Sequence, residues 1–427
     1  MPVSPASANT VASSLGAAPG VRGTQGIADF YAARQQRPLW LYAGRPSPAS
    51  QNLLRLLATA SIDQLDPNRY NMRGIAEALG AASNGNPRAA GKAEELLSQA
   101  FTDYARDMRN APHAGLNYID ASLRPSPPTP RSLLEQAAAA PSLDNHVRTM
   151  GWMNPLYAPL RQALATNNYR TPHERSLLQV NLERARAIPP APGRFVLVNA
   201  AAQKLFMYEN GQAVDSMRVV VGKPKHATPM MAALIRFASL NPYWNVPPDL
   251  AAERIAPNVV SDGLGYLRTR GYQVLSSWDD SAQIVDPATI DWKGVADGRT
   301  EVRVRQLPGP GNAMGQMKFM FPNQFGIYLH DTPERELLAE ASRLYSGGCV
   351  RLEDAPRLGR WLFGQPLEAS SKQPELPVNM ITPVPVVITY LTAVPSGSSI
   401  VYFDDIYGRD AQRMAQLGGI GGVAGGR

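Results

Sequence analysis

Cysteine is almost absent from this chain of 427 residues, which contains only Cys349. A single cysteine excludes an internal disulfide framework and any metal site built from several thiolates. A lone cysteine is either a small buried hydrophobic side chain or a thiol kept for chemistry. Composition does not decide between these two interpretations.

Several catalytic signatures are also missing. The chain has no His-Glu-x-x-His and no Cys-x-x-Cys, which argues against a zinc site. It has no Gly-x-x-x-x-Gly-Lys-Ser/Thr phosphate loop and no Gly-x-Ser-x-Gly elbow. None of its lysines has a serine three positions earlier, so the Ser-x-x-Lys of penicillin-binding enzymes is absent. We therefore expect no metal and no cofactor.

The charge balance is basic, with 42 Lys and Arg against 35 Asp and Glu and a pI of about 9.5. A basic surface attracts anionic polymers such as nucleic acid, acidic lipid or a carboxylate-rich cell wall. No dense Lys/Arg run interleaved with aromatics occurs, so nucleic-acid binding is not favoured. No apolar run approaches the roughly 18 residues of a membrane span, so we expect no transmembrane segment.

The first half of the chain has a helical pattern. Residues 1–26 are rich in Ala, Ser, Pro and Gly, lack the features of a secretory signal, and predict a flexible leader. Residues 27–190 repeat apolar side chains at three- and four-residue spacing, as in the stripe of Leu97, Phe101, Tyr104 and Met108. This pattern predicts an all-α domain that ends at the prolines of 189–192.

The second half is rich in β-branched runs. Strands are predicted within 195–198, 204–208, 217–221, 234–240, 301–306, 318–321, 327–330, 384–392 and 400–403, with a helix over 354–363. The Asn210-Gly211 pair predicts a hairpin turn. Residues 191–412 thus form a β-rich domain, which makes the fold class α+β. The Gly-rich residues 413–427 predict a disordered tail.

The chemistry centres on Ser346-Gly-Gly-Cys349-Val-Arg351. Two glycines before a cysteine let backbone N–H groups converge on one point, and a base would activate the thiol. Of the five histidines, His330 ends a strand-like segment and precedes Cys349 by 19 residues. A His330/Cys349 catalytic pair and an inert buried cysteine beside a core histidine both remain open on residue logic alone.

These residues resemble a known signature. His330-Asp-Thr, a spacer and Ser346-Gly-Gly-Cys349-Val-Arg351 resemble the motif of the L,D-transpeptidase catalytic domain. Asn241-Pro-Tyr-Trp-Asn-Val-Pro247 resembles a stretch of the large periplasmic Gram-negative members. Residues 402–410, and Phe30-Tyr31 through Pro38-Leu-Trp40, also look like theirs. The resemblance spans about 27–412.

The sequence departs from that family at two places. Many members carry a histidine where Gly347 stands. The large members also place a small peptidoglycan-binding module between the scaffold and the catalytic domain, and the interval of 157–188 is too short for one. The resemblance implies a helical scaffold followed by a catalytic domain, with residues of about 248–315 forming a lid-like insertion.

The resemblance also implies roles for individual residues. Cys349 would be the nucleophile and His330 its base, oriented by a backbone carbonyl of Asp331 or Thr332. The N–H groups of Gly348 and Cys349 would form the oxyanion hole. The remaining candidates for substrate binding are Arg351, Tyr328, Ser346, Gly347 and Trp244.

Three of these candidates have structural alternatives. Arg351 either binds a stem-peptide carboxylate or pairs with Glu353 or Asp354. Tyr328 shares a strand face with His330, where it lines the donor site or packs in the core. Trp244 lines the cleft or belongs to the core, and Ser346 supports the nucleophile loop.

The implied reaction is a two-step acyl transfer. Cys349 attacks a carbonyl of a peptidoglycan stem peptide, and a diaminopimelate amine on a neighbouring stem resolves the thioester into a crosslink. The link joins either two third residues or a first residue (L-Ala) to a third. A cysteine amidase or carboxypeptidase and a non-catalytic wall-binding protein are the alternatives. The resemblance places the protein in the periplasm, as a monomer that binds donor and acceptor stem peptides and that carbapenems acylate.

Overall fold

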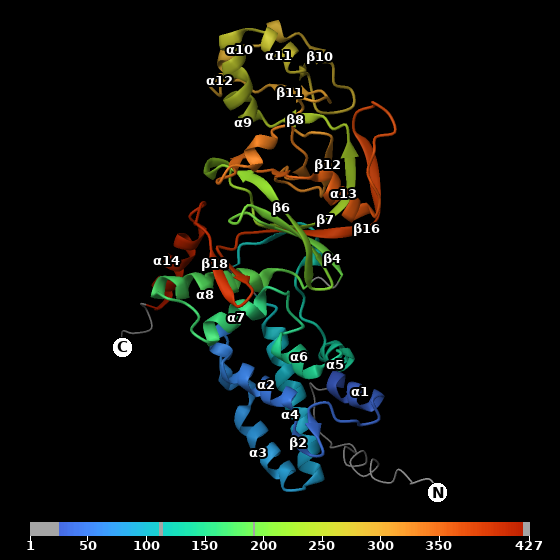
Figure 1. Cartoon of the computed structure of the whole chain (residues 1–427), viewed down its shortest axis with the longest axis vertical. Coiled ribbons are helices and arrows are strands. Elements are labelled where there is room, and N and C mark those ends of the chain that lie inside the picture. The colour runs from blue at the N-terminus through green and yellow to red at the C-terminus, as the bar shows by residue number, and fades with distance from the viewer. Residues whose placement is uncertain (1–24, 111–113, 191–192, 422–427) are drawn as a thin grey trace. The chain divides into compact units, whose positions relative to one another are not determined.

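The computed structural model describes residues 25–110, 114–190 and 193–421 (Figure 1). They form two compact units. The first contains the described residues up to Leu116 together with 124–190 and 391–421, and the second contains 117–123 and 193–390. The first unit is mostly helical and the second is strand-rich, so the predicted α+β class is confirmed. The expected leader up to residue 24 and the last six residues of the tail lie outside the described residues.

Most of the first unit consists of α-helices. They are α1 (Gln25–Ala33), α2 (Pro48–Ala58), α3 (Met72–Ser83), α4 (Pro87–Asp107), α5 (Pro130–Ala139), α6 (Leu143–Arg148), α7 (Tyr157–Ala165), α8 (Pro172–Ala187) and α14 (Arg409–Gly421). Short elements complete it: β1 (Leu41–Tyr42), β2 (Arg45–Pro46), the 3-10 turns η1 (Ala60–Asp63) and η2 (Pro67–Tyr70), β17 (Ala393–Ser396) and β18 (Ser399–Tyr402).

Proline starts several of these helices. Helices α2, α4, α5 and α8 each begin at a proline that follows a capping residue, namely Ser47, Asn86, Thr129 and Thr171. Each capping side chain accepts a backbone N–H of the first turn. Proline suits this position because its φ is already helical and its missing N–H would have no partner there. These four prolines therefore mark where helices begin.

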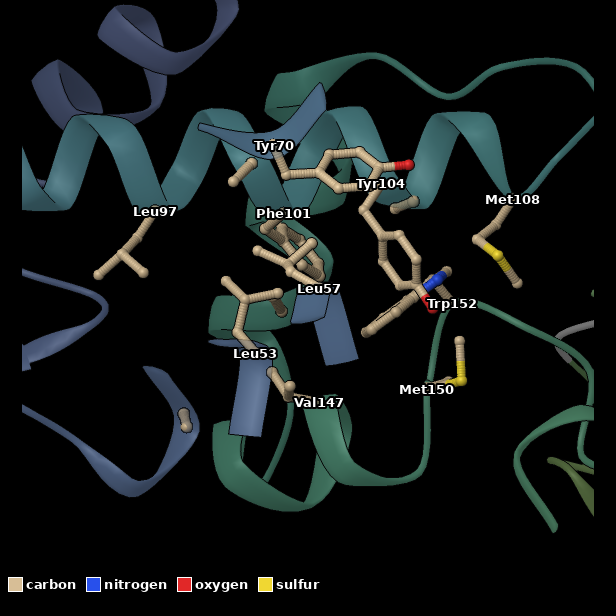
Figure 2. Close-up of a cluster of buried hydrophobic side chains, with 14 of the residues drawn as sticks. Leu53, Leu57, Tyr70, Leu97, Phe101, Tyr104, Met108, Val147, Met150 and Trp152 are labelled. Carbon is tan, nitrogen blue, oxygen red and sulfur yellow. The ribbon is translucent and has the colours of Figure 1, made fainter. Parts of the chain in front are cut away.

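The predicted apolar stripe forms the core of the first unit. Leu97, Phe101 and Tyr104 on α4, and Met108 directly after it, are all fully buried. Figure 2 shows Phe101 near Leu57 of α2 and Tyr104 near Trp152, with Leu97 and Met108 at the two ends of this row. The Phe101 and Trp152 rings pack edge to face, with their centroids 5.1 Å apart. Burial of aromatic side chains at this density contributes much of the stability of such a unit.

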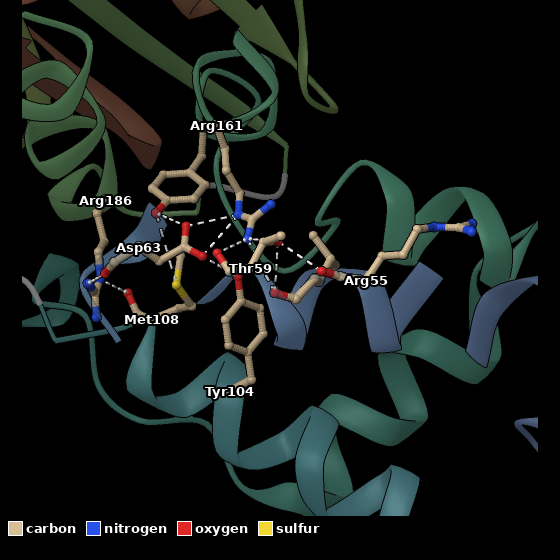
Figure 3. A network of polar contacts seen from close by, with 9 residues as sticks. Arg55, Thr59, Asp63, Tyr104, Met108, Arg161 and Arg186 are labelled. Atoms are coloured by element: carbon tan, nitrogen blue, oxygen red, sulfur yellow. Dashed lines mark hydrogen bonds and ion pairs between the residues drawn. The ribbon is translucent and has the colours of Figure 1, made fainter. Parts of the chain in front are cut away.

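A buried acid also stands in this unit. Asp63 accepts hydrogen bonds from the hydroxyls of Tyr104 and Tyr157 at 2.7 and 2.8 Å and pairs with Arg161 at 2.9 Å. Arg161 in turn donates to the carbonyl oxygen of Thr59 at 2.9 Å, as Figure 3 shows. Every oxygen of the buried carboxylate thus has a partner, which is the condition under which a buried charge is tolerated.

The second unit is built on a closed sheet. The strand order is β12-β13-β15-β6-β5-β4-β16-β7-β3, with β14 beside β6, and β12 also pairs with β7 and closes the run. The strands are β3 (Asn117–Tyr118), β4 (Arg194–Asn199), β5 (Lys204–Glu209), β6 (Gln212–Gly222), β7 (Met231–Leu240), β12 (Met317–Met320), β13 (Leu329–His330), β14 (Leu344–Ser346), β15 (Val350–Leu352) and β16 (Leu376–Thr389). Helix α13 (Ala355–Phe363) and the 3-10 turns η3 (Ala121–Leu123), η4 (Pro224–His226) and η7 (Arg335–Leu338) complete it.

Local sequence explains much of this sheet. Asn210 and Gly211 both have positive φ, 49° and 81°, as the tight turn between β5 and β6 requires. Strand β4 is buried along almost its whole length, in agreement with its unbroken apolar run. The predicted strands of 195–198 and 204–208 and the helix of 354–363 agree with the observed bounds to within one residue, whereas the predicted strand of 217–221 lies inside the longer β6.

Residues 244–314 form an insertion with a core of its own. Strands β8 (Trp244–Val246), β9 (Tyr272–Leu275), β10 (Ile284–Val285) and β11 (Arg303–Gln306) form a separate sheet in the order β10-β9-β11-β8. Around it lie α9 (Pro248–Leu250), the π-helical turn η5 (Ala251–Ile255), α10 (Ala256–Asp262), α11 (Gly265–Thr269), η6 (Pro287–Thr289) and α12 (Trp292–Ala296). Figure 1 shows these helices and strands grouped together.

The end of the chain differs from the expectation. Residues 391–412 belong to the helical unit, not to the β-rich one, and residues 413–421 continue helix α14 where a disordered tail was predicted. Two contacts explain the helix. Asp405 accepts the N–H groups of Asp410 and Ala411 at its start, and Arg413 makes a two-point ion pair with Glu183 of α8. Tertiary contacts thus override the low helix propensity of the glycines.

Candidate active site

Strand register brings the candidate residues to one face of the sheet. Strands β13 and β15 are parallel, with His330 opposite Arg351. One step earlier, the Val350 N–H donates to the Tyr328 carbonyl oxygen at 3.1 Å. Side chains two residues apart share a face, so Tyr328 and His330 on one segment face the same way as Cys349 and Arg351 on the other. His330 and Cys349 are diagonal neighbours, a separation that an imidazole ring can span.

Ser346 shapes the turn that presents the cysteine. Its hydroxyl donates to the Cys349 carbonyl oxygen at 2.6 Å and accepts the Gly348 N–H at 3.1 Å. Thr228 holds the other side of the turn through a 2.8 Å bond to the Gly348 carbonyl oxygen. Gly348 has φ of +116°, a backbone region closed to other residues, so glycine is required there.

The Cys349 thiol is partly exposed and protonated at rest. It donates to the Gly326 carbonyl oxygen at 3.5 Å. Burial raises the pKa of Cys349 to about 11, against the lowering effect of Tyr328 and of the cations Arg351 and Lys318. Burial raises the pKa of Tyr328 well above its usual value too, and the adjacent Cys349 adds to this. A thiol of this kind needs a base to become a nucleophile.

His330 is placed to be that base. Its side chain is buried, and Nδ1 lies 2.6 Å from the Asp331 carbonyl oxygen. A carbonyl oxygen only accepts, so Nδ1 carries the proton and Nε2 keeps its lone pair. Burial, followed by the positive charges of Arg351 and Lys318, lowers the pKa of His330 to about 3. The imidazole is therefore neutral near pH 7 and able to take a proton.

The donors available to an oxyanion differ from those expected. The Gly348 N–H is already engaged by the Ser346 hydroxyl, because the tight turn folds it inward. Within the described residues the Cys349 N–H has no hydrogen-bond acceptor. The Cys349 N–H is thus the donor that this structure leaves open, and Gly348 contributes through its backbone conformation.

Asp331 acts through both its backbone and its side chain. Its carboxylate is buried and accepts the Gln316 N–H at 2.9 Å and an ion pair from Arg335 at 2.6 Å. A Cβ on Gly315 would lie 2.6 Å from the Asp331 Cβ, which explains the glycine there. The side chain therefore fixes the carbonyl that orients His330, and its own partners in the described part of the chain are Gln316 and Arg335.

Arg351 has an unexpected partner. Its guanidinium pairs with Glu334, and only 7% of the residue is exposed. The partners that we expected for an ion pair are engaged elsewhere: Glu353 binds Arg218, and Asp354 caps helix α13. The expectation of Glu353 or Asp354 was therefore wrong. Glu334, which follows β13 and precedes Arg351 by 17 residues, takes the place of the two acids that lie next to Arg351 in the sequence.

Two further candidates are in contact with the insertion. A Cβ at Gly347 would come within 2.6 Å of Leu250 Cδ1, so Leu250 of α9 occupies the space where many relatives place a histidine. Trp244 is 8% exposed and packs in the core of the insertion, 6.4 Å from the Tyr272 ring. This burial agrees with the core role that we kept open for Trp244.

Sequence reasoning missed Lys318, Glu334 and Glu375. Lys318 lies opposite His330 on β12 and forms an ion pair with Glu375 at 2.8 Å. The available signal was weak, since Lys318 only begins an apolar strand and the two acids lie in loops or turns. Among the described residues, no group of three or more His, Cys, Asp or Glu is arranged to hold a metal ion. In the same part of the chain no helix is long and apolar enough to cross a bilayer.

Two family models match separate parts of the chain. Residues 25–164 match a family model described as a scaffold domain, and residues 193–386 match one described as the L,D-transpeptidase catalytic domain. The chain is 29% identical over 405 residues to a protein of Haemophilus influenzae (strain ATCC 51907 / DSM 11121 / KW20 / Rd) that bears the provisional name L,D-transpeptidase. That match covers 90% of this chain and 78% of the relative.

Solved structures give weaker matches. An L,D-transpeptidase from Mycobacterium smegmatis is 14% identical, with a TM-score of 0.24, over 47% of this chain and 59% of that one. L,D-transpeptidase 3 from Mycobacterium tuberculosis, in complex with a faropenem-derived adduct, is 11% identical, with a TM-score of 0.21, over 47% of this chain and 61% of that one. The chain thus spans less than two thirds of either structure, and the sequence matches carry the comparison.

Proposed function

The chain carries an L,D-transpeptidase catalytic domain preceded by a scaffold domain, and from this we propose that it crosslinks peptidoglycan stem peptides through a thioester on Cys349. The observation that supports the proposal is the shared sheet face of Cys349 and His330. On that face a thiol lies diagonal to a neutral, oriented imidazole. A structural cysteine needs no such neighbour.

The first step is acylation of the enzyme. His330 Nε2 takes the thiol proton as Cys349 Sγ attacks a carbonyl carbon of the donor stem. The Cys349 N–H faces the developing oxyanion. The bond to the leaving amine then breaks, and the imidazolium returns its proton to that amine. The products are a thioester on Cys349, a free amine and a neutral imidazole.

The second step transfers the acyl group. An amine of a neighbouring stem, which we propose to be the side-chain amine of diaminopimelate, attacks the thioester carbonyl while His330 takes one of its protons. The C–S bond breaks, a new amide forms, and the proton passes to the sulfur. The basic character of the chain suits an acidic polymer such as peptidoglycan. We further propose that the enzyme works in the periplasm as a monomer.

The linkage has two candidate forms. In the first form, the donor carbonyl belongs to the third residue of one stem and becomes linked to the third residue of another stem. In the second form, the link joins the first residue (L-Ala) of one stem to the third residue of another. The short interval between scaffold and catalytic units, without a peptidoglycan-binding module, makes the first-to-third form attractive, and the two forms are nearly level. We also propose that carbapenems acylate Cys349, since a penem-derived adduct is named for the Mycobacterium tuberculosis structure.

Product analysis tests the proposal. The purified enzyme is incubated with defined muropeptides, and the products are sequenced by tandem mass spectrometry. We expect amide-linked dimers whose fragments identify the two joined residues, and we expect Cys349→Ala and Cys349→Ser to lose at least about 1,000-fold in rate while staying folded. Hydrolysed monomers alone would identify an amidase or carboxypeptidase. Wall binding without any product from the wild-type enzyme would identify a non-catalytic protein.

A further inference from the structure

Three buried side chains form a row across strands β12, β13 and β15. Lys318 is in register with His330 on one side, and Arg351 is in register with it on the other. Paired residues on neighbouring strands point to the same face, with Cβ atoms about 5 Å apart. The exposed fractions of the three residues are 9%, 1% and 7%. The imidazole thus stands between an ammonium and a guanidinium in a place with little water.

Each cation of the row forms an ion pair with an acid. Lys318 Nζ lies 2.8 Å from Glu375, and Arg351 pairs with Glu334. Glu375 is also fixed by the Ser239 hydroxyl at 2.6 Å and the Tyr243 N–H at 2.9 Å. Burying a lysine is costly unless it is paired and the pair is well held. The Glu375 site meets that condition, which indicates a fold that keeps an ammonium at this position.

The charged and titratable groups around His330 come from four elements. They are Lys318 on β12, Tyr328 before β13, Cys349 and Arg351 at β15, and the Asp331–Arg335 and Arg351–Glu334 pairs beyond the strand end. The Tyr328 ring lies 6.0 Å from the imidazole and 5.9 Å from Lys318 Nζ. Of the two cations in register with His330, Arg351 belongs to the motif and Lys318 does not.

We propose that Lys318 is a positioning residue for the catalytic pair, whose ammonium, held by Glu375, keeps the His330 imidazole neutral and favours ionisation of the Cys349 thiol. This inference deepens the proposed function and rests on His330 and Cys349 acting together. A positive charge beside the imidazole disfavours its protonated form, and the same charge favours a nearby thiolate. The directions of the pKa changes of His330 and Cys349 that are attributed to Lys318 agree with this.

The two members of the ion pair should then have opposite effects. Lys318→Met removes the positive charge, so the thiolate of Cys349 becomes harder to form. Glu375→Gln leaves the ammonium without its counter-charge, so the thiolate becomes easier to form. If the ion pair were only structural, both substitutions would change the reactivity of Cys349 in the same direction, because the loss of either partner disturbs the site in the same way. The sign of the change therefore separates the two roles.

The test is the rate of Cys349 alkylation by iodoacetamide from pH 6 to pH 10, since Cys349 is the chain's one cysteine. At pH 8 we expect Lys318→Met to slow alkylation about threefold or more, Glu375→Gln to speed it by a similar factor, and Lys318→Arg to stay near the wild-type rate. Lys225→Met is the matched control, because Lys225 forms an exposed lysine–glutamate pair with Glu253 in the same unit.

Rates that change in the same direction for Lys318→Met and Glu375→Gln, or that do not change, would overturn the inference. If Lys318→Met does not fold, Glu375→Gln still decides the sign, because slower or unchanged alkylation in that variant would overturn the inference. The assay uses no wall substrate, so it separates the two proposals. If the two variants change the alkylation rate in opposite directions but the enzyme forms no crosslinked product, the inference about Lys318 holds and the proposed function is wrong. If the enzyme forms crosslinks but the two rates do not change in opposite directions, the proposed function holds and the inference is wrong.

Discussion

Each unit contains a buried polar cluster, and the two clusters differ in how their charges are paired. In the helical unit, Asp63 is matched by Arg161 and by two tyrosine hydroxyls, so that its charge is balanced within one shell of contacts. In the β-rich unit, Lys318 and Arg351 flank His330, and each of them pairs with one acid, Glu375 and Glu334 respectively. The imidazole itself therefore faces positive charge.

The difference separates structural from chemical use of a buried charge. A charge matched on all sides stabilises one arrangement of the chain once the fold has formed, and its tyrosine and arginine partners, whose pKa values are raised, keep their protons at neutral pH. A charge that is paired with one acid and also lies beside a titratable group shifts the pKa of that group. We therefore expect changes in the Asp63 cluster to alter stability and changes in the Lys318–His330–Arg351 row to alter reactivity.

The largest expected effect on stability is at Asp63. Asp63→Ala leaves the Arg161 guanidinium buried without a counter-charge, and we expect the free energy of unfolding to fall by about 3–5 kcal/mol. Urea unfolding followed by circular dichroism measures the change. The exposed Arg73–Glu77 pair supplies the control, since Arg73→Ala should cost at most about 0.5 kcal/mol. In the folded fraction of Asp63→Ala, Cys349 should be alkylated by iodoacetamide at the wild-type rate. A slower rate would show that the Asp63 cluster also affects reactivity.

The next effect is a loss of stability in acid. In the unfolded chain His330 takes up a proton near pH 6.5, whereas the folded chain holds the pKa of His330 at about 3. The unfolded state thus binds more protons as the pH falls through this window, and the free energy of unfolding decreases. Between pH 6.5 and pH 4.5 the contribution is about 2 kcal/mol.

Comparing variants isolates that contribution. His330→Gln should lose this part of the pH dependence, while His173→Gln, at an exposed position of α8, should keep it. Urea unfolding at pH 4.5 and pH 7.5 supplies both values for each protein. Parallel curves for the wild type and His330→Gln would show that the imidazole is not held neutral by the fold.

The smallest effect contrasts two adjacent glycines. Gly348→Ala forces a Cβ into a φ of +116° and to 3.2 Å from Ile327, so we expect it to cost about 1–2 kcal/mol and most of the crosslinking rate. Gly347→Ala meets only the end of the Leu250 side chain, which can rotate away, and should cost less than half as much. Unfolding and turnover measured on both variants give the comparison. Equal losses would mean that the strain at Gly348 does not hold the thiol in place.

Local signals predicted most of the fold. The apolar stripe on α4, the Asn210-Gly211 turn and the long apolar strands follow from periodicity and turn chemistry, which depend on neighbours in sequence. The insertion was expected only as a lid-like segment, because its strands are two to four residues long and carry too little pattern. Helix α14 was missed because its stability comes from Glu183 and Asp405, contacts that propensity does not contain.

The site was predictable to the extent that it lies within one motif. His330, Cys349 and the glycines were found from their chemistry and spacing, and the resemblance supplied their roles. Lys318 and Glu334 were not found, because register between strands and a chain reversal bring them to the site. The Gly348 N–H was expected to face the substrate, but the Ser346 hydroxyl engages it, a detail that depends on side-chain geometry within the turn.

The mass of the intact enzyme during turnover tests the central claim most directly. The protein is mixed with a donor stem peptide without an acceptor, quenched in acid and measured by mass spectrometry, then digested to locate the adduct. We predict a single acyl adduct on Cys349 that hydroxylamine removes, as a thioester requires, and that disappears into crosslinked product when the acceptor amine is added. Crosslinks formed without any adduct on Cys349, or formed equally well by Cys349→Ala, would contradict the account.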